Sequence, residues 1–272
     1  MNISQSCFLA PIHAPKFNDG LHFIKSYNQY YLDDHIFLVF SSNAEKEQFA
    51  ILAKGLRYRS IVCNQIKSSG VITEKKYFGL IHIFQHTNFE NVGVVDVDTE
   101  FFKTVNYSDL FVKYNERGIL WGNDYEFCPD PMTKSPAKFF NSVEQQIIAS
   151  KSSNLRVYFW FNDIPVYNRK YFLDFIKHID YQKRCSELTW VDFDFMIYGY
   201  YLLLKGYFTI KPFIINEDKM LNNIFIEDQY IIDPETFSKL FAKCRPMWIK
   251  RDIEPELMTQ TFMHLHLDRR PE

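Results

Sequence analysis

Short hydrophobic runs and helix-spaced hydrophobic positions alternate along the first hundred residues. The runs predict buried strands, and the stretches between them, whose apolar residues recur every three or four positions, predict helices. The predicted strands are Cys7–Ile12, His35–Ser41, Ser60–Asn64 and Val92–Val97, and the predicted helices are Gly20–Tyr31, Ala44–Lys54 and Thr73–His86. Because strands that alternate with helices form mostly parallel sheets flanked by helices, we expect an α/β fold.

The second half of the chain is less regular, and we expect its strands to extend the same sheet. These strands are Gly118–Trp121, Arg156–Phe161 and Tyr207–Pro212, and the helices are Asn168–Ile179 and Asp192–Lys205. No repeat, low-complexity tract or flexible linker divides the sequence. We therefore predict a single domain over residues 1–226, with a nucleotide-binding half at 1–125 and an acceptor half at 126–226. We expect residues 227–272 to form a C-terminal extension packed on this domain.

Composition and charge exclude several classes of protein. The net charge is −2, which is not the strongly basic balance of a dedicated nucleic-acid binder. No two of the nine glycines are spaced as G-x-G, which argues against a dinucleotide fingerprint, a phosphate-binding P-loop and a G-x-S-x-G nucleophile elbow. Three large enzyme classes therefore become poor candidates.

Cysteine usage and apolar runs indicate the compartment. The five cysteines are odd in number and far apart, so neither a disulfide framework nor a C-x-x-C zinc site is predicted. The N-terminus lacks a basic signal-peptide region, and the longest charge-free apolar run, near Met196–Leu204, is too short to span a bilayer. We expect a protein of the reducing cytoplasm.

The candidate chemical centre is Asp96-x-Asp98, at the end of the apolar run Val94–Val97. In a strand, side chains at i and i+2 share a face, so both carboxylates would lie together at the carboxyl edge of a parallel sheet. Paired carboxylates at that edge suit Mg²⁺ or Mn²⁺ bound to a diphosphate. The alternative is an exposed strand end with two solvated aspartates.

At these residues the sequence resembles the GT-A superfamily of nucleotide-sugar-dependent glycosyltransferases. The matching segments are Phe8–Ile12, Ile72–Lys76, Asn91–Phe102, Asn162–Tyr167 and Val191–Tyr200, the last two similar to the acceptor side of certain bacterial members. The resemblance implies transfer of a sugar from a nucleotide-sugar, with UDP-sugar as the first expectation, to a glycan or lipid-linked acceptor. The pathway it suggests is bacterial polysaccharide or lipooligosaccharide biosynthesis.

The resemblance also implies site residues. Asp98 would be the principal ligand of Mn²⁺ or Mg²⁺, and Asp96 would contact the metal or the ribose. The strand that ends at Pro11 leads into the nucleotide pocket, beside His13. Two alternatives of other classes remain: a catalytically silent nucleotide-binding module, and a haloacid-dehalogenase-like phosphatase, in whose D-x-D-x-T motif Thr99 would stand one position early.

The segment Met263–Asp268 could bring further ligands to the metal. If it is extended, its alternation places His264 and His266 on one face, and either imidazole could be the third metal ligand. Arg269 follows, with a guanidinium suited to phosphate. We expect this tail to close over the donor; the alternative is two surface histidines on an exposed strand.

An inverting transferase needs a carboxylate that takes the proton of the acceptor hydroxyl. Asp192 and Asp194 open a helix rich in Tyr and Leu, and Asp194 is the preferred candidate because Asp192 is the natural N-cap. Trp121 and Asn123 could line the sugar site, although Trp121 could equally be a core residue. Lys75 and Lys76 stand at a helix start, where the helix dipole disfavours lysine, and they could contact phosphate or be solvated surface lysines.

A strip at 237–251 mixes five basic residues with aromatic and aliphatic ones. Such a strip could lie on an anionic membrane surface, where a transferase would meet a lipid-linked acceptor. The alternative is an amphipathic helix packed on the sheet. The sequence leaves the oligomeric state open.

Overall fold

A computed structural model describes residues 5–101, 104, 106–123, 134–153, 155–157, 164–212 and 264–266, with the backbone alone described at 121, 123, 212 and 264–266. Its main sheet has five strands in the order β3-β2-β1-β4-β8. The strands are β1 Ser6–Pro11, β2 Ile36–Phe40, β3 Arg59–Val62, β4 Asn91–Val94 and β8 Val166–Asn168. The first four are parallel and β8 is antiparallel to β4, which confirms the predicted α/β fold with a mostly parallel sheet.

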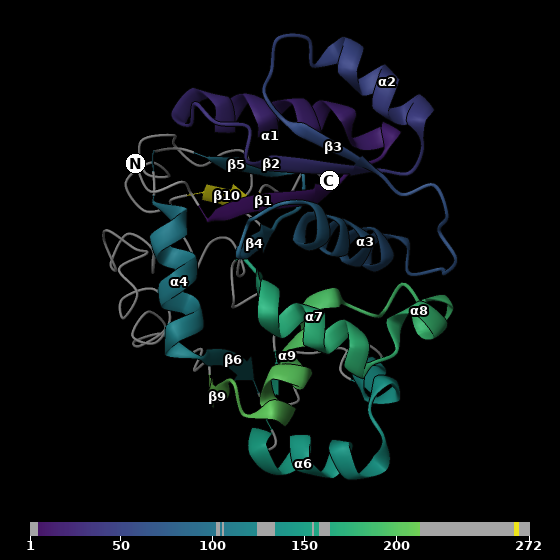
Figure 1. Ribbon diagram of the computed structural model, residues 1–272, viewed down its shortest axis with the longest axis vertical. Coiled ribbons are helices and arrows are strands. Elements are labelled where there is room, and N and C mark those ends of the chain that lie inside the picture. Colours follow the sequence, from purple (N-terminus) through teal and green to yellow (C-terminus); the bar gives the residue numbers. More distant parts are fainter. Residues whose placement is uncertain are drawn as a thin grey trace, which may run out of the picture.

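Helices cover both faces of this sheet (Figure 1). Helices α1 (Phe17–Tyr30) and α2 (Asn43–Leu52) lie above the strands in that view, and α3 (Val71–His86) lies below them. Successive residues of β1 show the two faces. Phe8 packs against the ring of Tyr27 in α1, whereas Leu9 lies against the backbone of α3 at Gly79.

The polar residues that precede the helices explain several of the helix boundaries. Ser42 accepts a hydrogen bond from the backbone of Glu45 at the start of α2, and Asn106 does the same for Asp109 in α4 (Tyr107–Arg117). Helix α6 (Ser142–Ser152) begins with a capping box. The remaining helical segments are η1 Ala14–Lys16, η3 Ser135–Phe139, α7 Arg169–His178, α8 Tyr181–Arg184, η5 Cys185–Glu187 and α9 Asp194–Lys205.

The prediction that the three later strands extend the main sheet is wrong. Strands β6 (Ile119–Asn123), β7 (Arg156–Val157) and β9 (Thr209–Pro212) pair with one another as a separate three-stranded sheet. Of the described strands in the second half, β8, which the hydrophobic pattern did not predict, is the one that joins the main sheet. A hydrophobic run predicts that a strand forms, but its pairing partner is chosen by long-range contacts.

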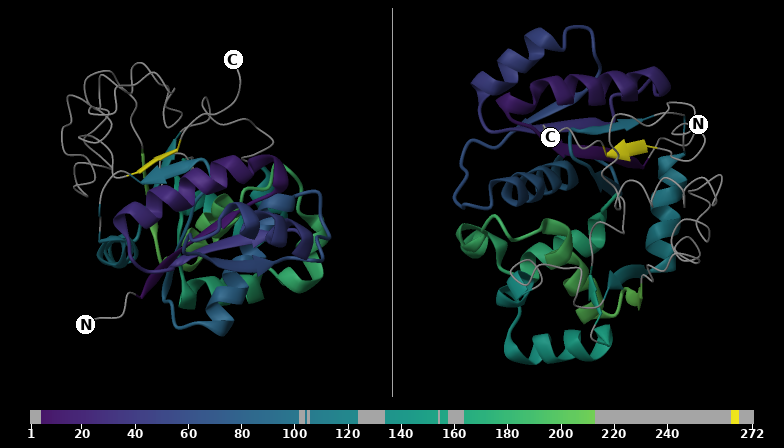
Figure 2. Two further views of the ribbon diagram at one scale, coloured as in Figure 1. Left: turned by 90° about the horizontal axis from the view of Figure 1, so that it is seen from above. Right: turned by 180° about the vertical axis from the view of Figure 1, so that it is seen from behind.

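A third pairing brings the C-terminal segment back to the first half. Strand β10 (His264–His266) runs antiparallel to β5 (Thr99–Phe101), and His266 lies opposite Thr99. Figure 2 shows the yellow β10 beside the teal β5 in both views. The extended conformation expected around Met263–Asp268 is therefore found for residues 264–266, and the strip at 237–251 lies outside the described residues.

Buried side chains from both halves form one hydrophobic cluster, which runs from Cys7 on β1 to Phe208 before β9. The cysteines of the described residues, Cys7, Cys63 and Cys185, are free and buried. None of the helices in the described part of the chain combines the length and apolar content needed to cross a bilayer.

Candidate active site

The predicted site lies where the direction of strand order reverses. The chain passes from β1 to β2 and β3 on one side, and then returns to β4 on the other side of β1. Backbone pairing continues past both strand ends, because Ile12 N donates to Val39 O at 3.0 Å and Val95 N donates to Leu9 O at 2.9 Å. His13 and Asp96 therefore follow adjacent parallel strands at a topological switch point, where α/β sheets bind ligands.

Asp96 and Asp98 lie on a turn and not on a strand. Strand β4 ends at Val94, three residues earlier than predicted, and Thr99 N donates to Asp96 O at 3.1 Å. The expectation that the two carboxylates share a strand face is therefore wrong in its geometry. A tight turn still keeps both residues at the carboxyl edge of the sheet, since its four residues form one hydrogen-bonded unit.

Lys76, on the second turn of α3, connects this edge to the second half of the chain. Its Nζ lies 3.4 Å from Asp96 Oδ1 and 3.3 Å from Asp194 Oδ1. Burial opposes the charge of Lys76, but the carboxylates of Asp194 and Asp96 outweigh it and raise the pKa of the ammonium above its ordinary value. The result is a fixed positive charge between two carboxylates that come from distant parts of the chain.

Asp194 is held from three sides. Its carboxylate accepts a hydrogen bond from the phenol of Tyr167 on β8 and an ion pair from Lys76, and its backbone carbonyl accepts from Tyr77 Oη at 2.8 Å. The side chain is 4% exposed. A buried carboxylate of this kind needs a counter-charge and hydrogen bonds, and this one has both.

The carboxylate of Asp192 is buried in the turn that precedes α9. It accepts from Thr189 N at 2.6 Å and Thr189 Oγ1 at 2.8 Å and pairs with Lys138, and the side chain is fully buried. The expectation that Asp192 caps the helix is wrong, because the N-cap of α9 is Phe193. All of these contacts are made by Oδ2, whereas Oδ1 is buried and has no hydrogen-bond partner among the described residues.

Lys75 is buried, so the interpretation of it as a solvated lysine is wrong. Its Nζ donates to the carbonyl of Ile12 at 2.6 Å, just beyond the end of β1. Burial lowers the pKa of Lys75, while the nearby Glu45 carboxylate and Cys63 act in the opposite direction. Burial, and then the charge of Lys75, lowers the pKa of His13. Lys75 therefore supports the loop that follows β1.

The turn of Asp96 and Asp98 supplies only part of a metal-binding site. Asp98 is buried and has Lys16 Nζ 3.9 Å from its Oδ2, and Asp96 is more exposed. Two carboxylates on one turn are hard oxygen ligands of the type that Mg²⁺ and Mn²⁺ take alongside phosphate oxygens. Among the described side chains no group of three or more His, Cys, Asp or Glu could hold an ion. A third protein ligand, if one is used, must come from elsewhere.

The strand register places the backbone of His266 opposite Thr99, the residue after Asp98. The side chains of His264 and His266 lie outside the described atoms, as do those of Trp121 and Asn123 on β6. Pro11 is the buried last residue of β1. Arg269 lies outside the described residues.

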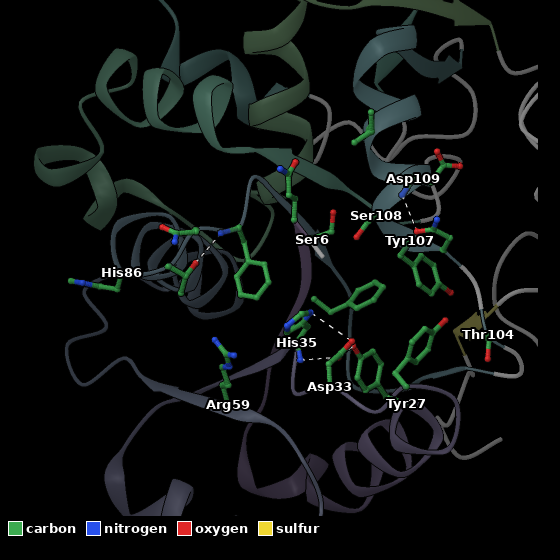
Figure 3. Close-up of a pocket in the computed structure, with 18 residues that line it drawn as sticks. Ser6, Tyr27, Asp33, His35, Arg59, His86, Thr104, Tyr107, Ser108 and Asp109 are labelled. Atoms are coloured by element: carbon green, nitrogen blue, oxygen red, sulfur yellow. Dashed lines mark hydrogen bonds and ion pairs between the residues drawn. The ribbon is translucent and has the colours of Figure 1, made fainter. Parts of the chain in front are cut away.

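A pocket of about 1210 Å³ lies at the opposite edge of the sheet (Figure 3). It is lined by Ser6, the first residue of β1, by His35 just before β2, and by Arg59, the first residue of β3. On one wall Asp33 accepts hydrogen bonds from the phenol of Tyr27 and the backbone of His35. None of the predicted site residues whose side chains are described lines this pocket, and the two aspartates of the turn and Asp194 lie outside it.

Sequence reasoning did not predict two contacts of this site, the bridge that Lys76 forms between Asp96 and Asp194 and the hydrogen bond that Tyr167 donates to Asp194. Lys76 carried a weak signal, because a lysine in the first turns of a helix is disfavoured by the helix dipole and therefore needs a local reason. Tyr167 carried no such signal, since a tyrosine in an apolar run is ordinarily interpreted as a core residue.

No protein-family model matches this chain, and no curated protein matches its sequence. Among solved structures, core-mannan synthase A from Aspergillus fumigatus in its Mn/GDP form is similar over 78% of this chain and 73% of its own, at 11% identity and a TM-score of 0.41. Mouse xyloside xylosyltransferase 1 in its apo form is similar over 76% of this chain and 84% of its own, at 12% identity and a TM-score of 0.36. At these TM-scores and identities neither likeness carries an argument about this chain.

Proposed function

We propose that this chain is a glycosyltransferase that moves a sugar from a nucleotide-sugar donor to a glycan acceptor. One observation carries the proposal. A turn with two aspartates at the switch point of the sheet is connected through Lys76 to a buried carboxylate, Asp194, that begins a helix of the other half. The first group suits a metal-bound diphosphate, and the second suits an acceptor hydroxyl on the other side of the transferred sugar.

The donor side would use Asp98 and Asp96 as ligands of Mn²⁺ or Mg²⁺, with His264 or His266 as a further ligand. A divalent ion bound there supplies positive charge that stabilises the departing nucleoside diphosphate. Pro11 and His13 would border the nucleotide, and Arg269 would contact phosphate. Lys75 would act indirectly, because it supports the loop of His13 through the carbonyl of Ile12.

The acceptor side would use Asp194 as the base that takes the hydroxyl proton, which favours inversion at the anomeric carbon. Lys76 and Tyr167 hold its carboxylate in one orientation, and a base must be held in this way to reach its proton. Trp121 and Asn123 would line the sugar site.

We propose UDP as the nucleotide, and a surface polysaccharide or lipooligosaccharide of a bacterium as the product. The enzyme would then work in the cytoplasm, with the strip at 237–251 in contact with the inner membrane surface when the acceptor is lipid-linked.

The metal assignment is tested by the change Asp98→Ala in the full chain. A thermal-shift screen of UDP, GDP and CMP with Mn²⁺ first identifies the nucleotide, and hydrolysis and transfer of the matching nucleotide-sugar are then measured. Asp98→Ala should abolish turnover and the metal-dependent part of the thermal shift with the fold intact, and Asp96→Ala should be nearly as severe. Glu116→Ala, which removes an exposed carboxylate from α4, is the matched control and should behave as wild type.

Three results would contradict this assignment. Full activity in excess EDTA, or wild-type turnover by Asp98→Ala, would remove the metal from the reaction. Nucleotide binding without any hydrolysis or transfer would indicate a silent binding module. Hydrolysis of p-nitrophenyl phosphate that depends on Asp96, without nucleotide-sugar turnover, would indicate a phosphatase.

A further inference from the structure

An exposed tryptophan precedes Asp194 by four residues. Trp190 is 74% exposed and lies on a turn that Asp192 N closes by donating to Thr189 O at 3.0 Å. Large aromatic side chains usually bury most of their surface, and those that stay exposed beside a polar site are typical of binding surfaces. The position of this indole therefore needs an explanation.

The turn that carries Trp190 is fixed by buried polar contacts. The carboxylate of Asp192 accepts two hydrogen bonds from Thr189, at 2.6 and 2.8 Å, and an ion pair from Lys138. Desolvating this carboxylate costs free energy that only its partners offset. The contacts hold the backbone of residues 189–192 in one conformation. The side chain of Trp190 therefore projects from a backbone position that is held in place.

Helix α3 fixes the same turn from the other side. Gly70 N donates to Leu188 O at 3.2 Å, and Thr73 Oγ1 donates to the carbonyl of Asp192. A Cβ at Gly70 would lie 2.7 Å from Thr189 O, so a side chain there would push the turn away. The same helix carries Lys76, which contacts Asp194 at 3.3 Å. Trp190 and the carboxylate site are thus positioned by one set of contacts.

The geometry points to Trp190 as the stacking platform for the sugar ring of the acceptor, with the reactive hydroxyl directed toward Asp194. This inference rests on the proposed function. A pyranose ring has an apolar face of C–H groups, which matches an exposed indole, and a polar rim of hydroxyls, which matches the polar groups Lys76 and Asp194 that the same helix α3 helps to position.

Sugar binding can be tested without catalysis. The chain has four tryptophans, so a ¹⁵N-labelled protein has few indole N–H resonances, and the Trp190→Phe variant assigns one of them to Trp190. The probes are methyl glycosides of glucose, galactose and mannose. We expect saturable shifts of the Trp190 resonance with at least one probe at millimolar concentration, unchanged in the control Leu32→Ala, which removes a similarly exposed side chain. No shift with any probe, or equal shifts of all the indoles, would overturn the proposal.

Two substitutions separate stacking from general apolar contact. With the responding glycoside as acceptor, Trp190→Leu should raise the acceptor KM by about tenfold or more, whereas Trp190→Tyr should stay close to wild type. The control Leu32→Ala should leave both the acceptor KM and donor hydrolysis unchanged. A wild-type KM in Trp190→Leu would overturn stacking and indicate that the surface meets a lipid or another protein. If the wild type turns over no donor while the Trp190 resonance still responds, the proposed function fails and the sugar site stands.

Discussion

Single residues of the site are distinguished by the contacts that surround them. Asp192 and Asp194 are two positions apart and both are buried, yet Oδ2 of Asp192 is bound by Thr189 and Lys138, whereas the carboxylate of Asp194 is bound by Lys76 and Tyr167. Thr189 belongs to the turn before α9, whereas Lys76 also contacts Asp96. The same residue type therefore takes two roles because its partners differ.

The two aspartates give matched predictions. Asp194→Asn should lower the transfer rate by about 10²–10⁴-fold while donor affinity stays nearly unchanged, because only proton removal is lost. Asp192→Asn should lower the melting temperature, because it leaves Lys138 without its charged partner, and should keep near-normal kcat in the folded protein. Steady-state kinetics and thermal unfolding of both variants check this. Near-normal kcat in Asp194→Asn, or a product that retains the anomeric configuration of the donor, would contradict the base assignment.

His13 should make the protein less stable in acid. Burial and Lys75 place the pKa of folded His13 below its ordinary value of 6.5. Below pH 6.5 the unfolded chain therefore binds the proton more readily than the folded one, and stability falls as the pH falls through this range. The difference in unfolding free energy between wild type and His13→Asn should shift in favour of the variant between pH 7 and pH 5, as measured by urea unfolding. His22→Asn, at an exposed position of α1, controls for loss of an imidazole.

Helix α3 is the element that organises the site. Its first turns contact the turn before α9 through Thr73 and the backbone of Asp194 through Tyr77. Lys76 on the same turns contacts the carboxylates of Asp96 and Asp194. Farther along, it packs on β1 and β2 with Gly79 against the side chains of Leu9 and Val39. The close packing of the helix on the sheet thus sets where Lys75 and Lys76 can reach.

Substitution of Gly79 should test this packing. A Cβ at Gly79 would lie 2.7 Å from Val39 Cγ2 and closer still to Leu9, so Gly79→Ala overpacks the interface. We expect a loss of about 1–3 kcal/mol in the free energy of unfolding, although alanine in an open helix would add about 1 kcal/mol. Phe78→Ala, at the exposed neighbouring position, should change stability by about 0.5 kcal/mol or less. A more stable Gly79→Ala would show that α3 does not pack this closely.

At the scale of the whole molecule, the C-terminal segment returns to the first half. The pairing of β10 with β5 brings residues 264–266 next to the turn of Asp96 and Asp98. A short strand pair buries little surface, so its contribution to global stability is small while its contribution to the site can be large.

Truncation after Thr261 should therefore weaken donor binding and catalysis far more than it lowers the melting temperature. Calorimetric titration of the nucleotide with Mn²⁺ and a thermal melt of the same sample compare the two effects. His264→Ala and His266→Ala, tested separately, identify which imidazole reaches the metal. Normal turnover by the truncated chain, or protease protection of the tail that is identical with and without nucleotide-sugar and Mn²⁺, would remove the tail from the site.

The sequence by itself determined the local elements and the edge at which the chemistry lies. Strands β1 to β4 and helices α1 to α3 follow from hydrophobic spacing, because burial of one face or of a whole run is a local requirement. The place of His13 and of the Asp96–Asp98 turn follows as well, since parallel strands present their carboxyl ends at one edge.

Only the tertiary structure decided which groups meet. Tyr77 and Asp194 are 117 residues apart in the chain, and nothing near either residue encodes the other. The burial of Lys75, the bridge through Lys76, the separate sheet of β6, β7 and β9 and the return of β10 to β5 depend on packing between distant segments. Hydrophobic periodicity specifies which face of an element is buried, but the partner of each polar group is chosen when those faces are brought together.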